Sequence, residues 1–340
     1  MGKSQLDLKG KISCEKILPY LALIKIPYFS FQGEVAYTNV YLIIDKELVL
    51  IDAGPWIKDY ANMIAMAFKQ LGLNFQDLSK IIYTHAHPDH IGGAIALNNE
   101  LKISHAIYWK ARKFVKQYGE YTKSVKSMLK AVFSKHLSSH PLEREIYFTF
   151  IDNFWKPTSG GIDIGHGLHE GESISTGRLK FKVLLTPGHS PFDISLWEEE
   201  KALLFSGDFL LKMNITLAGG IKGFGSDLVS YESSLKRIKP YLKKAKSVFP
   251  SHGPFITSCS NLADGPLRTI KLREDRILER LSTDRQSLIE LVAALSRKNQ
   301  NPLIFIRHLG VVLTHLEKLE MESKISCIQD GHNPIYELSR

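Results

Sequence analysis

Residue types that bind metals are concentrated in one short segment of this 340-residue chain. His85, His87, Asp89 and His90 fall within six residues, directly after the apolar run at 81–83. Alternate side chains of an extended segment point the same way, so His85 and His87 can hold one ion while Asp89 and His90 reach a second. The alternative is that these histidines lie in a polar surface loop. That is the usual place of a lone histidine, whereas this segment holds three. The segment therefore predicts a site for two metal ions.

Three more potential ligands follow apolar, strand-like runs later in the chain. They are His189 after residues 181–185, Asp208 after residues 202–205, and His252 after residues 247–249. A rigid sheet that carries such side chains at its strand ends presents them together and makes a preorganised site. We therefore expect all the candidate ligands to meet at one edge of a sheet.

With these motifs in this order, the chain resembles the metallo-β-lactamase superfamily. The resemblance is to its glyoxalase II-like and lactamase-like branch, which includes thioester hydrolases and an endoribonuclease. It implies an α/β fold in which two sheets pack between layers of helices, a four-layer αββα sandwich. It also implies a small C-terminal helical domain of the winged-helix kind.

The resemblance assigns a role to each motif residue. The first metal would be held by His85, His87 and His189, and the second by Asp89, His90 and His252, with Asp208 bridging the two. Asp52, in the Asp-x-Gly motif of residues 52–54, would lie close behind the ligands and orient them. An aspartate that only caps a turn is the alternative for Asp52.

Two ions that share a carboxylate generate a nucleophile without a serine or cysteine. Metal binding lowers the pKa of water from about 16 to about 7, so a hydroxide between the ions would attack a thioester or ester carbonyl. Asp89 and Asp208 are the expected catalytic carboxylates; Asp89 can orient the hydroxide and relay a proton to the leaving group. We expect zinc, with iron and manganese as alternatives, because histidine and carboxylate ligands suit all three.

The expected function is hydrolysis of a thioester or ester of a small, anionic acyl compound or carrier-linked substrate. A single-strand-specific endoribonuclease, with RNA as the partner, is the alternative, followed by a lactonase and a persulfide dioxygenase. An antibiotic-hydrolysing β-lactamase is disfavoured, since those enzymes have a cysteine or a gap where this chain has Asp208. A binding protein with a structural metal is also disfavoured, because structural sites are closed by four protein ligands.

Charge and composition indicate a soluble protein, and the positive charge fits an anionic substrate or simply a soluble cationic protein equally well. The chain has 44 Lys and Arg against 35 Asp and Glu, a formal net charge of +9. It has no run of about 20 apolar residues that could span a bilayer, and its first residues lack the apolar core of a signal peptide. Three widely spaced cysteines indicate reduced thiols. We therefore expect a cytoplasmic enzyme without membrane contact, and homodimerisation stays open.

The chain is predicted to comprise a catalytic domain at 1–262 and a linker helix with a winged-helix-like module at 263–340. In the first, residues 36–51 are typical of a hairpin, residues 57–71 of a helix and residues 80–83 of a strand. A basic run at 236–246 fits the exposed face of a surface helix. Two histidines near glycines, His166 and His169, are expected in a loop and not as ligands.

A basic helical insert is predicted at about 110–160. Residues 110–136 carry eight Lys and Arg against the single acid Glu120. The insert would cover the cleft as a lid for a phosphate-bearing carrier or RNA, or it would present only a solvated face. Its aromatic residues Tyr118, Tyr121 and Phe133 would stack on a base, or would belong to the core as aromatic residues at helical spacing usually do.

The tail has the pattern of helices followed by a hairpin. Helices are predicted at 266–281, 286–295 and 305–320, and strands at 325–329 and 335–338 with a turn at 330–331. This pattern favours a winged helix. Because the helices lack a concentrated basic recognition face, we expect the module to support the cleft or mediate dimerisation rather than to bind DNA.

Overall fold

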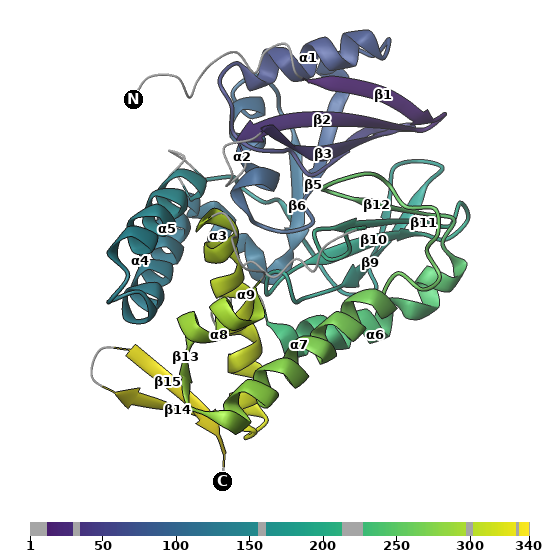
Figure 1. Cartoon of the computed structure of the whole chain (residues 1–340). Helices are drawn as coiled ribbons and strands as arrows, with labels where there is room; N and C mark the ends of the chain where they lie inside the picture. Colours follow the sequence, from purple (N-terminus) through teal and green to yellow (C-terminus); the bar gives the residue numbers. More distant parts are fainter. Residues whose placement is uncertain are drawn as a thin grey trace.

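The computed structural model describes residues 12–29, 35–155, 161–212, 227–296, 302–330 and 333–339. Two β-sheets pack face to face and helices cover their outer faces (Figure 1). This is the predicted αββα order of layers. A three-stranded sheet and its helices form a further region at the C-terminal end. In the part of the chain described, no helix is both long enough and apolar enough to cross a membrane.

The first sheet has seven strands in sequential order, β1 to β7. Strands β1 to β4 pair antiparallel, whereas β4 to β7 are parallel. The carboxyl ends of β4 and β5 therefore meet at one edge. The bounds are β1 (Ser13–Leu18), β2 (Leu21–Phe29), β3 (Val35–Ile44), β4 (Leu48–Ile51), β5 (Leu78–Ile82), β6 (Ser104–Tyr108) and β7 (His166–Leu168).

The second sheet has the strand order β12-β11-β10-β9-β8. Its neighbours are antiparallel except for β11 and β12, so β9, β11 and β12 all run in the same direction. These three are the strands that the sequence predicted before its later ligands. The bounds are β8 (Ser173–Ser175), β9 (Lys180–Leu185), β10 (Ile194–Glu198), β11 (Leu203–Gly207) and β12 (Ser247–Pro250).

Alternation of apolar side chains along the strands fills both faces of the first sheet. On β2, Leu21 and Leu23 belong to the core between the two sheets. Ala22 and Ile24 belong to the core on the other face, beneath the helices α1 (Tyr60–Gln70) and α2 (Pro88–Leu97). A period of two residues explains this division, because successive strand side chains point to opposite faces.

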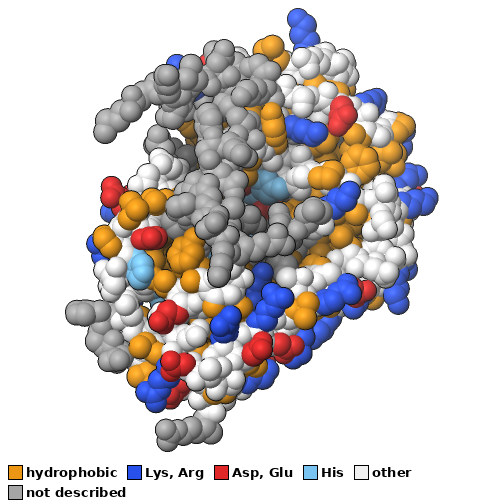
Figure 2. Space-filling view, in the orientation of Figure 1, with side chains coloured by type: hydrophobic (Ala, Val, Ile, Leu, Met, Phe, Trp, Pro, Cys, Tyr) orange, Lys and Arg blue, Asp and Glu red, His pale blue; other side chains and the backbone are white. Residues whose placement is uncertain are grey.

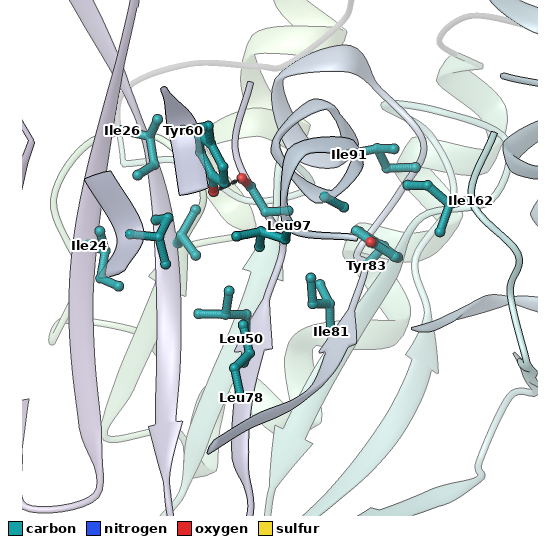
Figure 3. Packing of buried hydrophobic residues seen from close by; sticks show 14 of the residues in the cluster. Ile24, Ile26, Leu50, Tyr60, Leu78, Ile81, Tyr83, Ile91, Leu97 and Ile162 are labelled. Atoms are coloured by element: carbon teal, nitrogen blue, oxygen red, sulfur yellow. Dashed lines mark hydrogen bonds between the residues drawn. The ribbon is translucent and has the colours of Figure 1, made fainter. Parts of the chain in front are cut away.

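Figure 3 shows the packing beneath α1 and α2, where Leu50 and Ile81 of the sheet lie below Leu97 of α2 and Ile24 belongs to the same core. The Tyr60 hydroxyl at the start of α1 donates a hydrogen bond to the Ala53 carbonyl in this core. A short 3-10 helix, η1 (Phe75–Asp77), leads into β5. The second sheet is covered in the same way by α6 (Leu228–Lys244) and α7 (Asp264–Thr283).

The insert and the tail share one hydrophobic cluster, which we call the insert–tail core. It joins α4 and α5 to α7, α8, α9 and the C-terminal hairpin; Phe133, Ile151 and Leu316 are among its buried members. The insert consists of η2 (Trp109–Ala111), α3 (Arg112–Lys116), α4 (Tyr118–His136) and α5 (Pro141–Phe154). The tail consists of β13 (Gln286–Ser287), α8 (Leu288–Leu295), α9 (Pro302–Met321), β14 (Ile325–Asp330) and β15 (Asn333–Leu338).

Most of the predicted elements are found, with different ends. The hairpin at 36–51 is confirmed as the antiparallel pair β3 and β4. The expectation of a loop at His166 is wrong, because His166 begins β7, which pairs with β6 as an edge strand. The predicted turn at 330–331 reaches beyond the described residues. The domain boundary near 262 and the winged helix stay predictions.

Candidate metal centre

Strand ends bring the predicted ligands together, as the sequence implied. His85 follows β5 in the first sheet. His189, Asp208 and His252 follow β9, β11 and β12, the three strands of the second sheet that share a direction. Because the sheets are packed face to face, their ligand-bearing edges meet at one place. A histidine surface with acidic atoms beside it is visible near the middle of the face in Figure 2.

The start of α2 positions the second half of the first motif. Pro88 occupies the first turn of the helix, a position that proline favours because its ring sets the required backbone angle. Asp89 and His90 follow in the same turn and are buried. Close packing holds the helix against the loop after β4: a Cβ added at Gly93 would lie 2.2 Å from the Ala53 carbonyl oxygen. Any larger residue at this position would displace the helix start.

Three groups of potential metal donors adjoin one another. They are His85, His87 and His189; His85, His90 and Asp208; and Asp89, His90 and His252. Within each group the donor atoms lie within 4.8 Å of one another. All these residues are buried except His252, whose side chain is 19% exposed. The sets that the resemblance assigned to two metals are thus each gathered in space.

Asp208 lies between the two assigned ligand sets. Its Oδ2 is 3.4 Å from Nε2 of His189, in the first set. Its Oδ1 is 3.4 Å from Nε2 of His252 and 3.5 Å from Nε2 of His90, both in the second. The two oxygens therefore face different ligand sets, which is the arrangement that a bridging carboxylate requires.

Asp52 lies behind the ligands and holds one of them directly. Its Oδ2 accepts hydrogen bonds from Nδ1 of His90 at 2.9 Å and from the Ser251 hydroxyl at 3.0 Å. Oδ2 also accepts from the Thr84 hydroxyl at 2.8 Å, and Oδ1 from the Thr84 amide at 2.8 Å. Since the hydroxyl of Thr84 donates to Asp52, it accepts from Nδ1 of His85 at 3.0 Å. Both histidines thereby direct Nε2 toward the centre.

The backbone around these contacts is tightly constrained. Asp52 itself has a φ of 61°, a left-handed conformation that non-glycine residues adopt at a cost of about 1 kcal/mol or more. Gly207, directly before Asp208, has a φ of +55°, and an added Cβ would lie 2.8 Å from the Thr84 side chain. Glycine at 207 therefore makes room for the threonine that connects His85 with Asp52.

The loop that carries His252 is fixed by β3. Nδ1 of His252 donates to the Tyr37 carbonyl at 3.0 Å, which directs its Nε2 toward Asp89 at 3.2 Å. The Asn39 amide donates to the carbonyls of Pro250 and Gly253 at 2.9 and 2.7 Å. These contacts join the two sheets at the metal centre, so His252 is placed by residues more than 200 positions earlier.

The electrostatic environment fits positively charged ions. Burial, with neighbouring imidazoles next, lowers the pKa of His85 well below its usual value. Burial and then His189 lower the pKa of His87 to about 3. The rings of His85 and His87 are therefore neutral, and each can offer a lone pair to a metal ion. Burial also lowers the pKa of His90, but Asp208 and Asp89 outweigh it and raise that pKa well above its usual value. Carboxylates therefore favour a cation at the His90 side of the site.

Two buried ring nitrogens without partners show that these residues fit a metal ion. The Nε2 atoms of His85 and His90 are buried and have no hydrogen-bond partner. A buried polar atom without a partner costs about 1–3 kcal/mol, and a metal ion would satisfy both nitrogens. The histidine and aspartate clusters are consistent with the metal site of a metallo-β-lactamase fold.

The insert provides an aromatic wall that the sequence analysis did not identify. The Trp155 ring stands perpendicular to the His87 ring, with centroids 5.3 Å apart. The buried Tyr118 hydroxyl donates to the carbonyl of Ala86, between the first two histidines, at 3.2 Å. Tyr118 and Phe133 are core residues, the second of the two predictions made for them. No sequence signal pointed to Trp155, because the contact is formed only by the fold of α5.

Thr84 and Ser251 were also missed, although both lie inside the motifs. Each hydroxyl contacts Asp52, and their positions directly before His85 and His252 were the available signal. The basic residues of 236–246 lie at the end of α6 and just after it; Lys236, Arg237 and Lys243 are exposed, as predicted for that run. His166 and His169 contact Glu172 rather than the centre.

Comparison with known proteins shows which sequences this chain resembles. Residues 33–252 match the sequence model of the metallo-beta-lactamase superfamily. The chain is 26% identical over 333 residues to "Probable metallo-hydrolase YqjP" of Bacillus subtilis, covering 92% of this chain and 96% of that protein. It is 24% identical over 264 residues to "Atrochrysone carboxyl ACP thioesterase" of Aspergillus fumigatus, which is 76% of this chain and 47% of that protein.

A solved structure has the same fold over nearly the whole chain. The metallo-beta-lactamase family protein TTHA1429 from Thermus thermophilus matches with a TM-score of 0.76 and 21% sequence identity. The match covers 95% of this chain and 100% of that one. The C-terminal sheet and helices are therefore included in the likeness of fold.

Proposed function

Because the chain belongs to the metallo-β-lactamase superfamily, we propose that it hydrolyses the thioester or ester bond of a small anionic acyl compound. The chain is a metal-dependent hydrolase of this superfamily, and the bond that it cleaves is the proposal. The observation that carries it is the position of Asp208, whose two oxygens face the histidines of two ligand sets.

In this proposal each ligand has a defined place. His85, His87 and His189 would hold one metal ion and Asp89, His90 and His252 the other, and Asp208 has one oxygen near each set. We expect zinc, with iron and manganese as alternatives, because imidazole and carboxylate ligands suit each of them. When bound, the ions lower the pKa of water to about 7 and polarise the carbonyl oxygen of the substrate.

Asp89 is the protein group proposed to orient the attacking water. Its Oδ2 lies 3.2 Å from Nε2 of His252 and 3.7 Å from Nε2 of His90, at the more exposed side of the centre. A carboxylate at this place accepts a hydrogen bond from the water and aims its lone pair at the carbonyl carbon. Asp52 keeps the His90 ring fixed while this happens, through its bond to Nδ1.

The leaving group favours a thioester. Metal-bound carboxylates are deprotonated, so Asp89 can relay a proton only after it has taken one from the attacking water, and neither Asp89 nor Asp208 has a proton of its own to donate. A thiol has a pKa of about 8.5 and leaves readily as a thiolate, whereas an alkoxide needs a proton from an acid. The apolar face of Trp155 beside His87 suits an acyl chain. The thioesterase among the similar proteins supports the same bond type.

Single-stranded RNA is the second candidate substrate, favoured by one observation. Lys113, Lys116 and Lys123 of α3 and α4 are exposed on the insert, where they would contact phosphates. Several phosphate contacts make binding strongly dependent on salt. Binding of a short, uncharged thioester would not depend on salt in this way.

A parallel assay tests the proposal. The zinc-loaded full chain is given S-acetyl-N-acetylcysteamine and single-stranded RNA, with Asp89→Asn to exclude contaminants and Asp77→Asn, an exposed site on η1, as the matched control. We expect thioester cleavage that is lost in Asp89→Asn and kept in Asp77→Asn. RNA cleavage that depends on Asp89, without thioester turnover, would replace the proposal by the second candidate.

A further inference from the structure

A groove between the insert and the loop after His189 combines aromatic and cationic side chains. It has a volume of about 490 Å³ and is lined by Trp109, Lys110, Arg112, Lys113 and Phe192, which we call the Trp109 groove. That volume lies within the range of small-ligand sites, about 300–1,000 Å³. Four of the residues come from η2 and α3 of the insert, and the fifth comes from the loop after His189. The groove therefore lies between the insert and a ligand-bearing loop.

The aromatic part of the groove is exposed and held in place. The Trp109 residue is 45% exposed. The ring of His169 stacks on it, with centroids 5.8 Å apart and planes 21° from parallel. On the other side of the groove, Phe192 stacks on Phe114 at 5.7 Å. Two fixed ring systems thus offer flat surfaces for a planar ligand.

The cationic part has no internal counterion. Among the described residues, Lys110, Arg112 and Lys113 form no ion pair, and no acidic side chain lines the groove. Arg112 is positioned by a hydrogen bond from its guanidinium to the Ile164 carbonyl at 2.8 Å. Lys110 Nζ lies 5.4 Å from the centre of the Trp109 ring, so the charge and the indole are adjacent. Cations next to an exposed indole match a base joined to phosphates.

A row of aromatic rings leads from the groove to the metal centre. Phe114, which stacks on Phe192, contacts Tyr121 at 5.1 Å. Tyr121 contacts Trp155 at 6.1 Å, and Trp155 contacts His87 at 5.3 Å. Phe114, Tyr121 and Phe192 are all partly exposed. Trp155 is buried, and the row joins the groove to the ligands through ring contacts.

We propose that the Trp109 groove binds the nucleoside diphosphate end of an acyl thioester, while the thioester end reaches the metal centre. This inference rests on the proposed function and names the carrier class of its substrate. In the reaction, a water oxygen forms a bond to the acyl carbon and the C–S bond breaks. The sulfur leaves with the bonding electrons and takes one proton, and the acyl group leaves as a carboxylate with release of the other.

The size of the groove favours a nucleotide carrier over the other anionic carriers. Five residues and about 490 Å³ fit one nucleotide, whereas an RNA strand needs a series of stacking platforms along its length. An acidic carrier protein would contact a broad surface of about 800 Å² per partner, much larger than a groove lined by five residues. A ligand with a base and phosphates would use both Trp109 and the lysines beside it.

Selectivity between two thioesters tests the inference. Acetyl-coenzyme A carries a nucleoside diphosphate, and S-acetyl-N-acetylcysteamine has the same reacting end without it. In Lys110→Ala/Lys113→Ala and in Trp109→Ala, the ratio of kcat/KM for the two substrates should fall about tenfold or more towards the short substrate. Lys236→Ala/Lys243→Ala on α6 removes the same charge from exposed positions elsewhere and should leave the ratio unchanged.

Calorimetric titration with coenzyme A separates this inference from the proposed function. If the wild-type chain cleaves neither thioester but binds coenzyme A through Trp109 and the lysines, the groove assignment stands and the proposed reaction falls. If the short thioester is cleaved but coenzyme A does not bind and the ratio does not change, the inference is overturned. Weaker binding of single-stranded RNA in the same variants, with coenzyme A unbound, also overturns it.

Discussion

Oδ2 of Asp52 accepts a hydrogen bond from Nδ1 of His90 at 2.9 Å, in a place where neither side chain has any exposed area. The bond fixes the tautomer of the imidazole, so that Nε2 faces the centre. It also compensates in part for the left-handed backbone of Asp52. The pair converts a flexible ring into a donor with one orientation before any metal binds.

Asp52→Asn should reduce metal occupancy and lower kcat/KM about 10–100-fold, because an amide is a weaker acceptor for the His90, Thr84 and Ser251 protons. Asparagine tolerates the left-handed conformation, so the backbone should persist. Metal content by mass spectrometry and steady-state kinetics measure the effect. Full occupancy together with full activity would show that the carboxylate does not hold the ligands.

Asp208→Ala should lose at least one metal ion and reduce hydrolysis about 100-fold or more, since the shared ligand and its negative charge disappear. The fold should survive, which circular dichroism can check. Asp264→Ala, at an exposed carboxylate that pairs with Lys239 on the surface, is the matched control. Retained full activity in Asp208→Ala would contradict the dinuclear proposal.

Leu316→Ala should destabilise the insert–tail core without emptying the metal centre. Leu316 is fully buried in that core, and such a truncation costs about 2–5 kcal/mol of unfolding free energy. Denaturant unfolding and metal content are measured together. Leu272→Ala, at a side chain 54% exposed on α7, should change stability by less than about 0.5 kcal/mol. Loss of metal in Leu316→Ala would mean that the core also supports the ligands.

Stability should depend on pH through His136 of α4. Burial, with Lys135 next, lowers the pKa of His136 from 6.5 to about 4. Between these values the unfolded chain binds the proton and the folded chain does not, so stability is lost as the pH falls from 6.5 to 4. The loss is up to about 3 kcal/mol.

The variant His136→Phe keeps a ring against Tyr336, on which His136 stacks with centroids 6.4 Å apart, but removes the titrating group. Its unfolding free energy should fall less steeply than that of the wild type over this pH range. Chemical denaturation at a series of pH values measures both slopes. Equal slopes would show that His136 is protonated as easily in the folded chain as in the unfolded one.

That the candidate ligands lie together was predictable because each belongs to a short motif at the end of an apolar run. Each ligand follows an apolar run, and a strand end is where a buried run must release a polar side chain. His189, Asp208 and His252 therefore came together once β9, β11 and β12 proved to share a direction. The layers of the fold followed from the same strands, whose alternate residues fill two different cores.

Neither the contact of Trp155 with His87 nor strand β7 could be predicted from the sequence. Trp155 reaches His87 only because α5 packs against α4 and α9, which depends on residues far away in the chain. His166 is part of a three-residue edge strand among glycines, a segment too short for its pattern to differ from that of a loop. Short and non-local features are decided by tertiary packing rather than by periodicity.

The insert–tail core has a consequence for the order in which a nascent chain matures. Every proposed metal ligand precedes residue 253, so all of them are synthesised before α8 and α9. The helix that brings Trp155 to His87 packs on those later helices. During synthesis, therefore, the candidate ligands are complete before the aromatic residue beside His87 has the helices that support it.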